Sequence, residues 1–158
     1  YQFTRSFTEP VVAATDFLGR SQTIEREGTA FTAVRCWDDA KYQEDIPRVQ
    51  EVLSAVAEYI VGIRTVGQAR AYCVKDSPAS ETMYMYSLWT STTASRARIE
   101  DFVCEDFIEL SDDFFCCHVT ANFICTFRSR DDTTYELNYE MYFQRQKERW
   151  ALYDIATK

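Results

Sequence analysis

A long alternation of apolar and polar residues near the C-terminus restricts this chain to folds built on an antiparallel sheet. From residue 115 to 127 every odd-numbered residue is apolar, whereas the even-numbered ones include His118, Thr120, Asn122 and Thr126. A period of two is typical of a strand with one buried face. The stretch therefore predicts a long strand that is wholly apolar on one side.

Two further strands are predicted after it. The alternation repeats from Tyr135 to Phe143, and residues 150–155 read WALYDI, with apolar residues on both faces. The polar segments 128–132 and 144–148 are the expected reversals. A bent sheet with one apolar face needs a cover, which the rest of the chain should supply.

The strongest helical pattern begins after Asp45, which is expected to cap the helix. A continuous apolar stripe follows at helical spacing, made of Val49, Val52, Leu53, Val56, Ile60 and Ile63. Such a stripe is the natural cover for the sheet. Before it, residues 11–27 predict a first helix and residues 30–37 a short second one, with Gly28 between them.

Three other segments carry weaker patterns. Residues 1–8 fit a loose arm or a short edge strand, and residues 68–74 and 82–89 fit strands. Residues 98–110 fit either a helix or a strand, and we predict a strand that ends near Asp106. Helices first and an antiparallel sheet afterwards is an α+β order.

Composition and charge narrow the class of protein. A chain of 158 residues with 46% hydrophobic residues, 4 Gly and 3 Pro predicts one domain over residues 1–158, without linkers. The net charge of −8 argues against nucleic acid as a partner. No apolar run reaches the roughly 20 residues of a membrane span. We expect a cytoplasmic protein, although a start at Tyr1 leaves a removed signal peptide open.

Cysteine and histidine usage argues against a metal site or a cofactor. The six cysteines, at positions 36, 73, 104, 116, 117 and 125, include no C-x-x-C pair, and His118 is the single histidine. We expect free thiols in a reducing compartment, and a disulfide framework in a secreted protein remains the other reading. No metal and no cofactor are predicted.

Several segments resemble a known family. ASRARIEDF, HVTANFICTFRSR and YELNYEMYFQRQKERWALYDIAT resemble the closing strands of the nuclear transport factor 2-like, or SnoaL-like, superfamily. The nearest pattern is that of the small (β) subunit of ring-hydroxylating dioxygenases. DFLGR and WDDAKY, in the N-terminal third, are similar more loosely to the first helices of these proteins.

The resemblance implies a cone-shaped roll, in which N-terminal helices pack on a strongly curved, mostly antiparallel sheet and enclose a pocket. Enzymes of this fold use a carboxylate and often a histidine there as an acid/base pair. The carboxylate would fall near Glu25, and the histidine would fall near Ile99, where this chain has none. His118 replaces it only if the mixed face of its strand is concave. If that face is convex, His118 belongs to the surface or to an interface.

Two classes of function follow. The first is a cofactor-independent acid/base enzyme of the dehydratase, isomerase or cyclase type, acting on an apolar or aromatic small molecule. Its catalytic candidates are Glu25, Asp39 and His118, and its candidate ligand-binding residues are Phe31, Trp37, Tyr42, Tyr84, Tyr86 and Asn122. The second is a non-catalytic scaffold that resembles a dioxygenase β subunit and partners an oxygenase α subunit.

A homo-oligomer is expected in either class. Members of this fold commonly pair through the outer face of the sheet. The mixed face here carries Phe114, Ile124 and Tyr142, and apolar residues on a sheet face often mark an interface.

Overall fold

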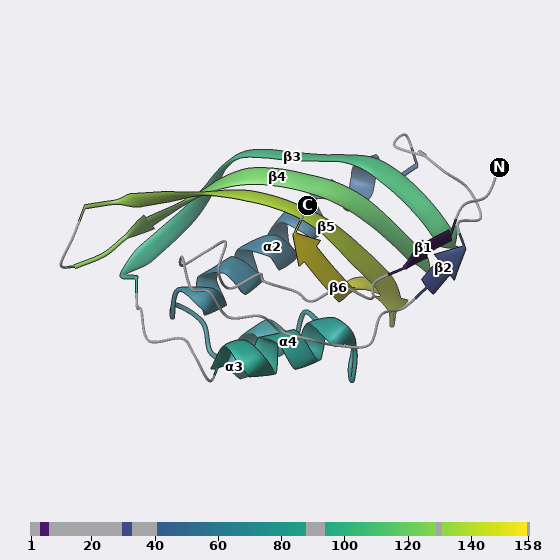
Figure 1. Ribbon diagram of the computed structural model, residues 1–158, viewed down its shortest axis with the longest axis horizontal. Coiled ribbons are helices and arrows are strands. Elements are labelled where there is room, and N and C mark those ends of the chain that lie inside the picture. The colour runs from purple at the N-terminus through teal and green to yellow at the C-terminus, as the bar shows by residue number, and fades with distance from the viewer. Residues whose placement is uncertain (1–3, 7–29, 33–40, 88–93, 129–130, 158) are drawn as a thin grey trace.

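The computed structural model of the chain describes residues 4–6, 30–32, 41–87, 94–128 and 131–157. The elements in chain order are β1 (Thr4–Ser6), β2 (Ala30–Thr32), the 3₁₀ turn η1 (Gln43–Asp45), α2 (Ile46–Ile60), α3 (Val66–Arg70), α4 (Pro78–Ser87), β3 (Arg96–Ser111), β4 (Phe114–Thr126), β5 (Thr133–Gln146) and β6 (Arg149–Thr157). The last four strands form one antiparallel sheet in the order β3-β4-β5-β6. The sheet arches over α2, with α3 and α4 beyond it on the same side (Figure 1). The predicted α+β class is confirmed.

The alternation that predicted β4 matches its burial. The odd-numbered residues from Phe115 to Cys125 are all buried, whereas the even-numbered ones from His118 to Thr126 are half-buried. We call the face that carries Phe115, Val119 and Phe123 the inner face, because these residues belong to the core between the sheet and α2. The opposite face, which carries His118, is the outer face.

Two bulges bend strand β3. The register with β4 slips between Glu100 and Val103 and again between Glu105 and Ile108. At each slip an aspartate takes a positive φ, 54° at Asp101 and 56° at Asp106. A bulge adds one residue to one strand of a pair and increases the local bend and twist. The two bulges therefore account for part of the curvature of the sheet.

The predicted cover for the sheet is confirmed as α2. Val49, Val52, Leu53, Val56 and Ile60 are all buried in the core shared with the sheet. The helix ends at Ile60, three residues before the end of the predicted stripe. Gly62, at a φ of 83°, lets the chain leave the helix, and the next residue is left exposed.

Two predicted strands are wrong. Residues 68–74 and 82–89 were expected to be extended, but α3 occupies residues 68–70 of the first segment and α4 occupies residues 82–87 of the second. A capping box starts α3, in which Thr65 Oγ1 accepts from the Gln68 backbone and the Gln68 side chain accepts from the Thr65 backbone. Pro78 starts α4, where its fixed φ suits the first helical turn.

Residues 72–74, at the end of the first of these two segments, still form hydrogen bonds with the sheet. The backbone of Tyr72–Val74 runs beside β6, with hydrogen bonds of 2.8 Å from Val74 N to Leu152 O and from Leu152 N to Tyr72 O. Cys73 forms an isolated parallel bridge with Leu152 there. This contact shields part of the open edge of β6, which lowers the risk of edge-to-edge pairing.

The N-terminal predictions have mixed outcomes. The short strand expected within residues 1–8 is confirmed as β1, which pairs with β2. The short helix predicted over 30–37 is wrong at its start, because residues 30–32 are extended and paired. Phe and Thr favour strands, and the pairing partner was not visible in the pattern. The first helix, predicted over 11–27, lies outside the described residues.

The strands of the sheet run further than predicted. β3 continues past Asp106 to Ser111, and β5 continues to Gln146. The last reversal is a two-residue turn at Lys147 and Glu148, both with positive φ. Among the helices of the described part, none is both long and apolar enough to cross a membrane.

Candidate functional site

The outer face of the sheet divides into a covered half and an open half. The outward side chains of the covered half are buried, and they are Ile108, Phe114, Cys116, Tyr142, Ala151 and Asp154. The open half comprises the outward side chains of residues 96–106, 118–126 and 134–140, which are exposed or half-buried. Phe114 and Tyr142 were expected to be exposed apolar residues of an interface, so this expectation is wrong for both. Ile124 is half-buried in the open half.

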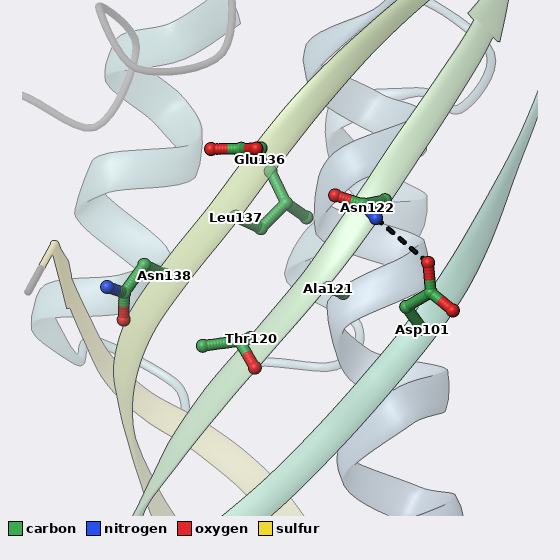
Figure 2. Close-up of a pocket in the computed structure, with 7 residues that line it drawn as sticks. All are labelled: Asp101, Thr120, Ala121, Asn122, Glu136, Leu137 and Asn138. Atoms are coloured by element: carbon green, nitrogen blue, oxygen red, sulfur yellow. Dashed lines mark hydrogen bonds between the residues drawn. The ribbon is translucent and has the colours of Figure 1, made fainter.

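A shallow depression lies in the middle of the open half (Figure 2). Its volume is about 270 Å³, and its lining residues are Asp101, Thr120, Ala121, Asn122, Glu136, Leu137 and Asn138. The Asn122 side chain donates to Asp101 Oδ2 at 3.0 Å. The first bulge thus turns the Asp101 carboxylate across the strand gap, where it fixes the amide that was predicted to bind ligand.

His118 lies beside this depression, on β4. Its Nε2 lies 2.6 Å from Asn138 Oδ1 on β5, and its Nδ1 lies 3.9 Å from Asp106 Oδ2 on β3. Because the mixed face of β4 is the outer face, His118 lies outside the helix-covered interior. The second of the two predicted alternatives, a surface or interface position, is the one that this placement supports.

The open half carries separated charges. Arg96 and Arg98 are exposed at one end of β3, and the exposed Arg128 follows the adjacent end of β4. The remainder is rich in carboxylates, namely Glu100, Asp101, Glu105, Asp106, Glu136 and Glu140. An ion pair of 2.8 Å between Arg98 and Glu100 marks the boundary between the two regions.

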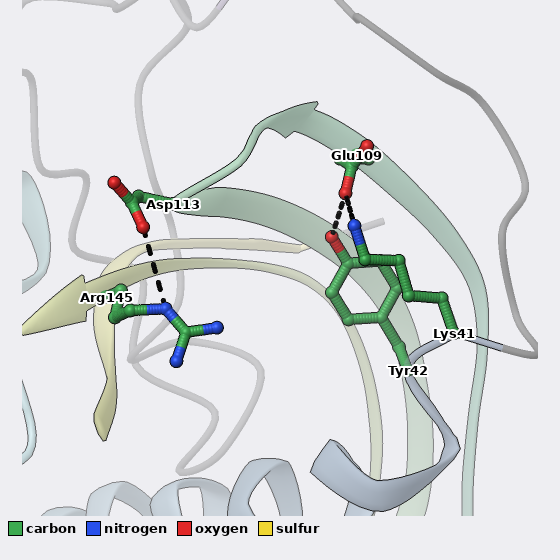
Figure 3. Close-up of polar contacts among 5 residues, drawn as sticks. All are labelled: Lys41, Tyr42, Glu109, Asp113 and Arg145. Carbon is green, nitrogen blue, oxygen red and sulfur yellow. Dashed lines mark hydrogen bonds and ion pairs between the residues drawn. The ribbon is translucent and has the colours of Figure 1, made fainter. Parts of the chain in front are cut away.

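A second polar group is buried on the inner face (Figure 3). The side chain of Glu109 is fully buried. Its Oε1 accepts a hydrogen bond of 2.9 Å from the Tyr42 hydroxyl and forms an ion pair with Lys41. Tyr42 stacks on Phe107 at 5.3 Å between ring centroids and packs against Phe115 at 4.7 Å. A buried carboxylate needs such partners, because removing it from water is costly.

The cluster joins the segment before α2 to the end of β3. The exposed fraction of the side chain is 42% for Lys41 and 0% for Glu109, so the ion pair reaches from solvent into the core. Nearby, Arg145 lies 3.5 Å from Asp113, and its guanidinium stacks on Trp150 at 4.4 Å. These contacts hold the β3–β4 and β5–β6 turns at the same end of the sheet.

The structure separates the residues that were predicted to form one site. Glu25, Trp37 and Asp39 lie outside the described residues, as do the side chains of Phe31, Tyr84 and Tyr86. Tyr42 is a buried core residue with an exposed fraction of 2%. His118 and Asn122 lie on the outer face, on the far side of the sheet from Tyr42.

Sequence reasoning missed Glu109 and both bulge aspartates. A signal for the bulges is present, since residues 99–108 read IEDFV followed by CEDFI, a repeat of five residues. A strand with one bulge in every five residues keeps the same face buried in each unit. Ile99, Phe102, Cys104 and Phe107 accordingly all pack on or within the core.

Burial also sets the chemistry of the described thiols. Desolvation raises the pKa of Cys117 well above its usual value, and a hydrogen bond with Cys104 adds to the rise. Desolvation raises the pKa of Cys73 to about 12, with the nearby Arg70 acting in the opposite direction. The thiolate is the nucleophile and the metal ligand, so neither cysteine suits that chemistry at neutral pH.

Comparisons with known proteins identify the fold and nothing finer. No family model and no curated protein matches the sequence. Among solved structures, the association domain of C. elegans CaMKII is similar with a TM-score of 0.51 and 11% identity, over 75% of this chain and 95% of that chain. An Ntf2-like protein involved in plasmid conjugation is similar with a TM-score of 0.48 and 8% identity, over 73% of this chain. This chain spans 39% of the conjugation protein.

Proposed function

We propose that this chain, which has the nuclear transport factor 2-like fold, is a non-catalytic association domain that pairs with a second copy through the open half of its outer face. The observation that carries the proposal is the separation of charge on that face. Arg96 and Arg98 stand at one end, and carboxylates occupy the rest. The solved CaMKII domain of the same fold is an association domain.

The charge pattern is self-complementary under a twofold axis. An axis in the plane of the face and across the strands would reverse the strand direction of the second copy. The basic end of each copy would then face the acidic region of the other. Pairs of like copies with closed twofold symmetry are the commonest oligomers, and complementary charge fixes their register.

The size of the face predicts a weak dimer. Three strands about 4.8 Å apart and about ten residues long at 3.3 Å each give a plane of roughly 400 Å² per copy. Stable interfaces bury roughly 800 Å² per partner. Val103, which is 45% exposed, and Ile124 are the apolar residues available at the centre. We therefore expect a dissociation constant in the micromolar range.

Charge reversal on the open half tests the proposal. In sedimentation velocity from about 1 to about 200 μM, the wild type should change from monomer to dimer. Arg98 and Glu105 lie at opposite ends of the open half of β3, so Arg98→Glu and Glu105→Lys should each stay monomeric, because like charges would meet across the twofold axis. An equimolar mixture of the two variants should dimerise again, because each variant restores the opposite charge for the other.

The matched control is Lys75→Glu, an exposed charge reversal outside the sheet. It should dimerise like the wild type. Raising the salt from about 0.05 to about 0.5 M should weaken the wild-type dimer, because the charges are exposed and screened. A wild type that stays monomeric throughout, or charge variants that pair normally, would contradict the proposal. Binding to an oxygenase α subunit by a monomeric wild type would favour the resemblance to a dioxygenase β subunit.

The buried Glu109 supports a second candidate, an acid/base enzyme acting on an aromatic or apolar molecule. Inside an aromatic cluster, a carboxylate beside a tyrosine hydroxyl and a lysine could move a proton. Glu25 and Asp39 remain proposals for the same role.

Glu109→Gln tests this candidate, since it keeps size and hydrogen bonding but removes proton transfer. With a panel of aromatic β-hydroxyketones, an enzyme should lose at least about a hundredfold in turnover and keep its ligand affinity. Absence of turnover by the wild type across the panel, with Glu109→Gln changing only thermal stability, would assign Glu109 to the core.

A further inference from the structure

We infer that Glu105, Asp106 and His118 on the outer face form a binding site for a divalent transition-metal ion such as Zn²⁺. One ligand atom from each residue can be chosen so that all three lie within 4.8 Å of one another. The inference does not rest on the proposed self-association. It concerns side chains of one copy only.

The distances are close to those of a bound ion. Zn²⁺ holds nitrogen and oxygen ligands at about 2.0–2.2 Å, so two ligands of a tetrahedral ion lie about 3.4 Å apart. His118 Nδ1 and Asp106 Oδ2 are 3.9 Å apart. A shift of about half an ångström would close this pair around such an ion, and a separation of up to 4.8 Å within the group would need a shift of up to about 1.4 Å.

The second bulge makes the site possible. Neighbouring residues of a regular strand point to opposite faces, so Glu105 and Asp106 could not both reach His118. Glu105 is the direct cross-strand partner of His118. The positive φ of Asp106 keeps its carboxylate on the same face, and Phe107 takes the buried position on the inner face.

The imidazole of His118 is oriented as in a metal site. Asn138 Oδ1 lies 2.6 Å from Nε2, so Nε2 carries a hydrogen and donates to it. The lone pair of Nδ1 then faces the Asp106 carboxylate, as it would in a site for a cation. Histidine ligands of metals usually donate a hydrogen bond from the N–H of their other ring nitrogen to such an oxygen.

The surroundings favour a cation of intermediate softness. Glu140, the cross-strand neighbour of His118 on β5, adds a carboxylate on the other side. One imidazole and two carboxylates suit Zn²⁺ better than Ca²⁺ or Mg²⁺, which prefer oxygen ligands alone. Three ligands from the protein leave a fourth position that water can fill.

Isothermal titration with ZnCl₂ tests the inference on the purified, tag-free chain. The wild type should bind one ion with a dissociation constant in the micromolar range, and MgCl₂ should give no comparable heat. His118→Gln and Asp106→Asn should each weaken binding at least tenfold. Asparagine tolerates the positive φ at position 106, and circular dichroism should show that both variants fold.

Two further variants separate this site from general attraction by the acidic face. Glu100→Gln removes a carboxylate of the same face outside the site, and it should keep the affinity within about twofold. Asn138→Leu leaves the three ligands but frees the imidazole, so it should weaken binding several-fold. Co²⁺ should give a visible d–d spectrum that His118→Gln removes.

Unchanged Zn²⁺ affinity in His118→Gln would overturn the inference, and so would failure of the wild type to bind at millimolar Zn²⁺. In the proposed dimer the basic end of one copy faces the acidic region that contains Glu105 and Asp106 of the other, so the titration is repeated on Arg98→Glu, which should be monomeric and should bind Zn²⁺ whether or not the wild type associates.

Discussion

Asp101 and Asp106 place side chains that a regular strand could not place. Each adopts a positive φ next to a register slip, and each turns a carboxylate toward a polar partner on β4, Asn122 or His118. Aspartate and asparagine tolerate this backbone region better than most residues do, because their short side chains bond locally. Both polar contacts on the outer face therefore depend on local backbone geometry.

The loss in free energy of unfolding caused by a β-branched residue at a position with positive φ can be measured. Asp101→Val should lower the free energy of unfolding by about 1–3 kcal/mol, since a β-branched residue is strained at positive φ. Asp101→Gly loses the hydrogen bond to Asn122 but accepts the backbone conformation, so it should cost less. Urea unfolding of both variants measures the difference, and equal losses would show that the hydrogen bond alone matters.

The raised pKa of Cys73 predicts a loss of stability at alkaline pH. The folded state keeps this thiol neutral up to about pH 12, whereas an unfolded chain ionises it from about pH 9. The contribution is therefore complete below pH 9 and decreases as the pH rises toward 12, by up to about 1 kcal/mol per pH unit. Comparing urea unfolding of wild type and Cys73→Ala at both ends of this window isolates the effect. A constant difference would contradict it.

Only some of the site residues could be predicted from the sequence, because the side on which a residue lies depends on the phase of the alternation. His118 and Asn122 are in phase with an unbroken alternation, so their shared face was correctly predicted. Phe102 and Cys104 face inward because the first bulge shifts the phase by one residue, and the second bulge restores the original phase for Phe107 and Glu109. The partners of a bulge cannot be counted until the pairing with β4 is known.

At the scale of elements, α2 and β4 were predictable because each satisfies one period alone. Residues 83–86 of α4 are Met, Tyr, Met and Tyr, which are large and apolar under either period, so alternation could not distinguish a helix from a buried strand. Pro78 at the helix start and the buried residues Ala79, Thr82 and Met83 fit the helix. The proline at the helix start is the residue that distinguishes the helix from a strand here.

Substitutions on the two sides of α2 test its role as the cover. Leu53 is fully buried against the sheet, so Leu53→Asp would bury an unpaired carboxylate and should cost several kcal/mol. Glu51 lies on the outer side in an ion pair of 3.3 Å with Arg48, so Glu51→Ala should change stability by less than about 0.5 kcal/mol. Thermal melts compare the two, and similar melting temperatures would contradict this packing.

At the scale of the whole molecule, the two faces of the sheet have different surroundings. The inner face is closed by α2 and by an aromatic cluster around Tyr42, whereas the open half of the outer face presents charge to solvent. The arched sheet and its cover followed from patterns within single segments. The division of the outer face did not, because it depends on which parts of the molecule lie against it.

The five-residue repeat of β3 has a consequence for how this strand can change in length. Removing one of the regularly paired residues from either unit would turn every later side chain of the strand to the wrong side, whereas removing Asp101 or Asp106 would remove its bulge and leave the other side chains on their faces. Removing or adding a whole unit would preserve the facing of all the others and change only the number of bends. Related chains should therefore differ here by a bulge residue or by steps of five residues, and each such change would deepen or flatten the arch.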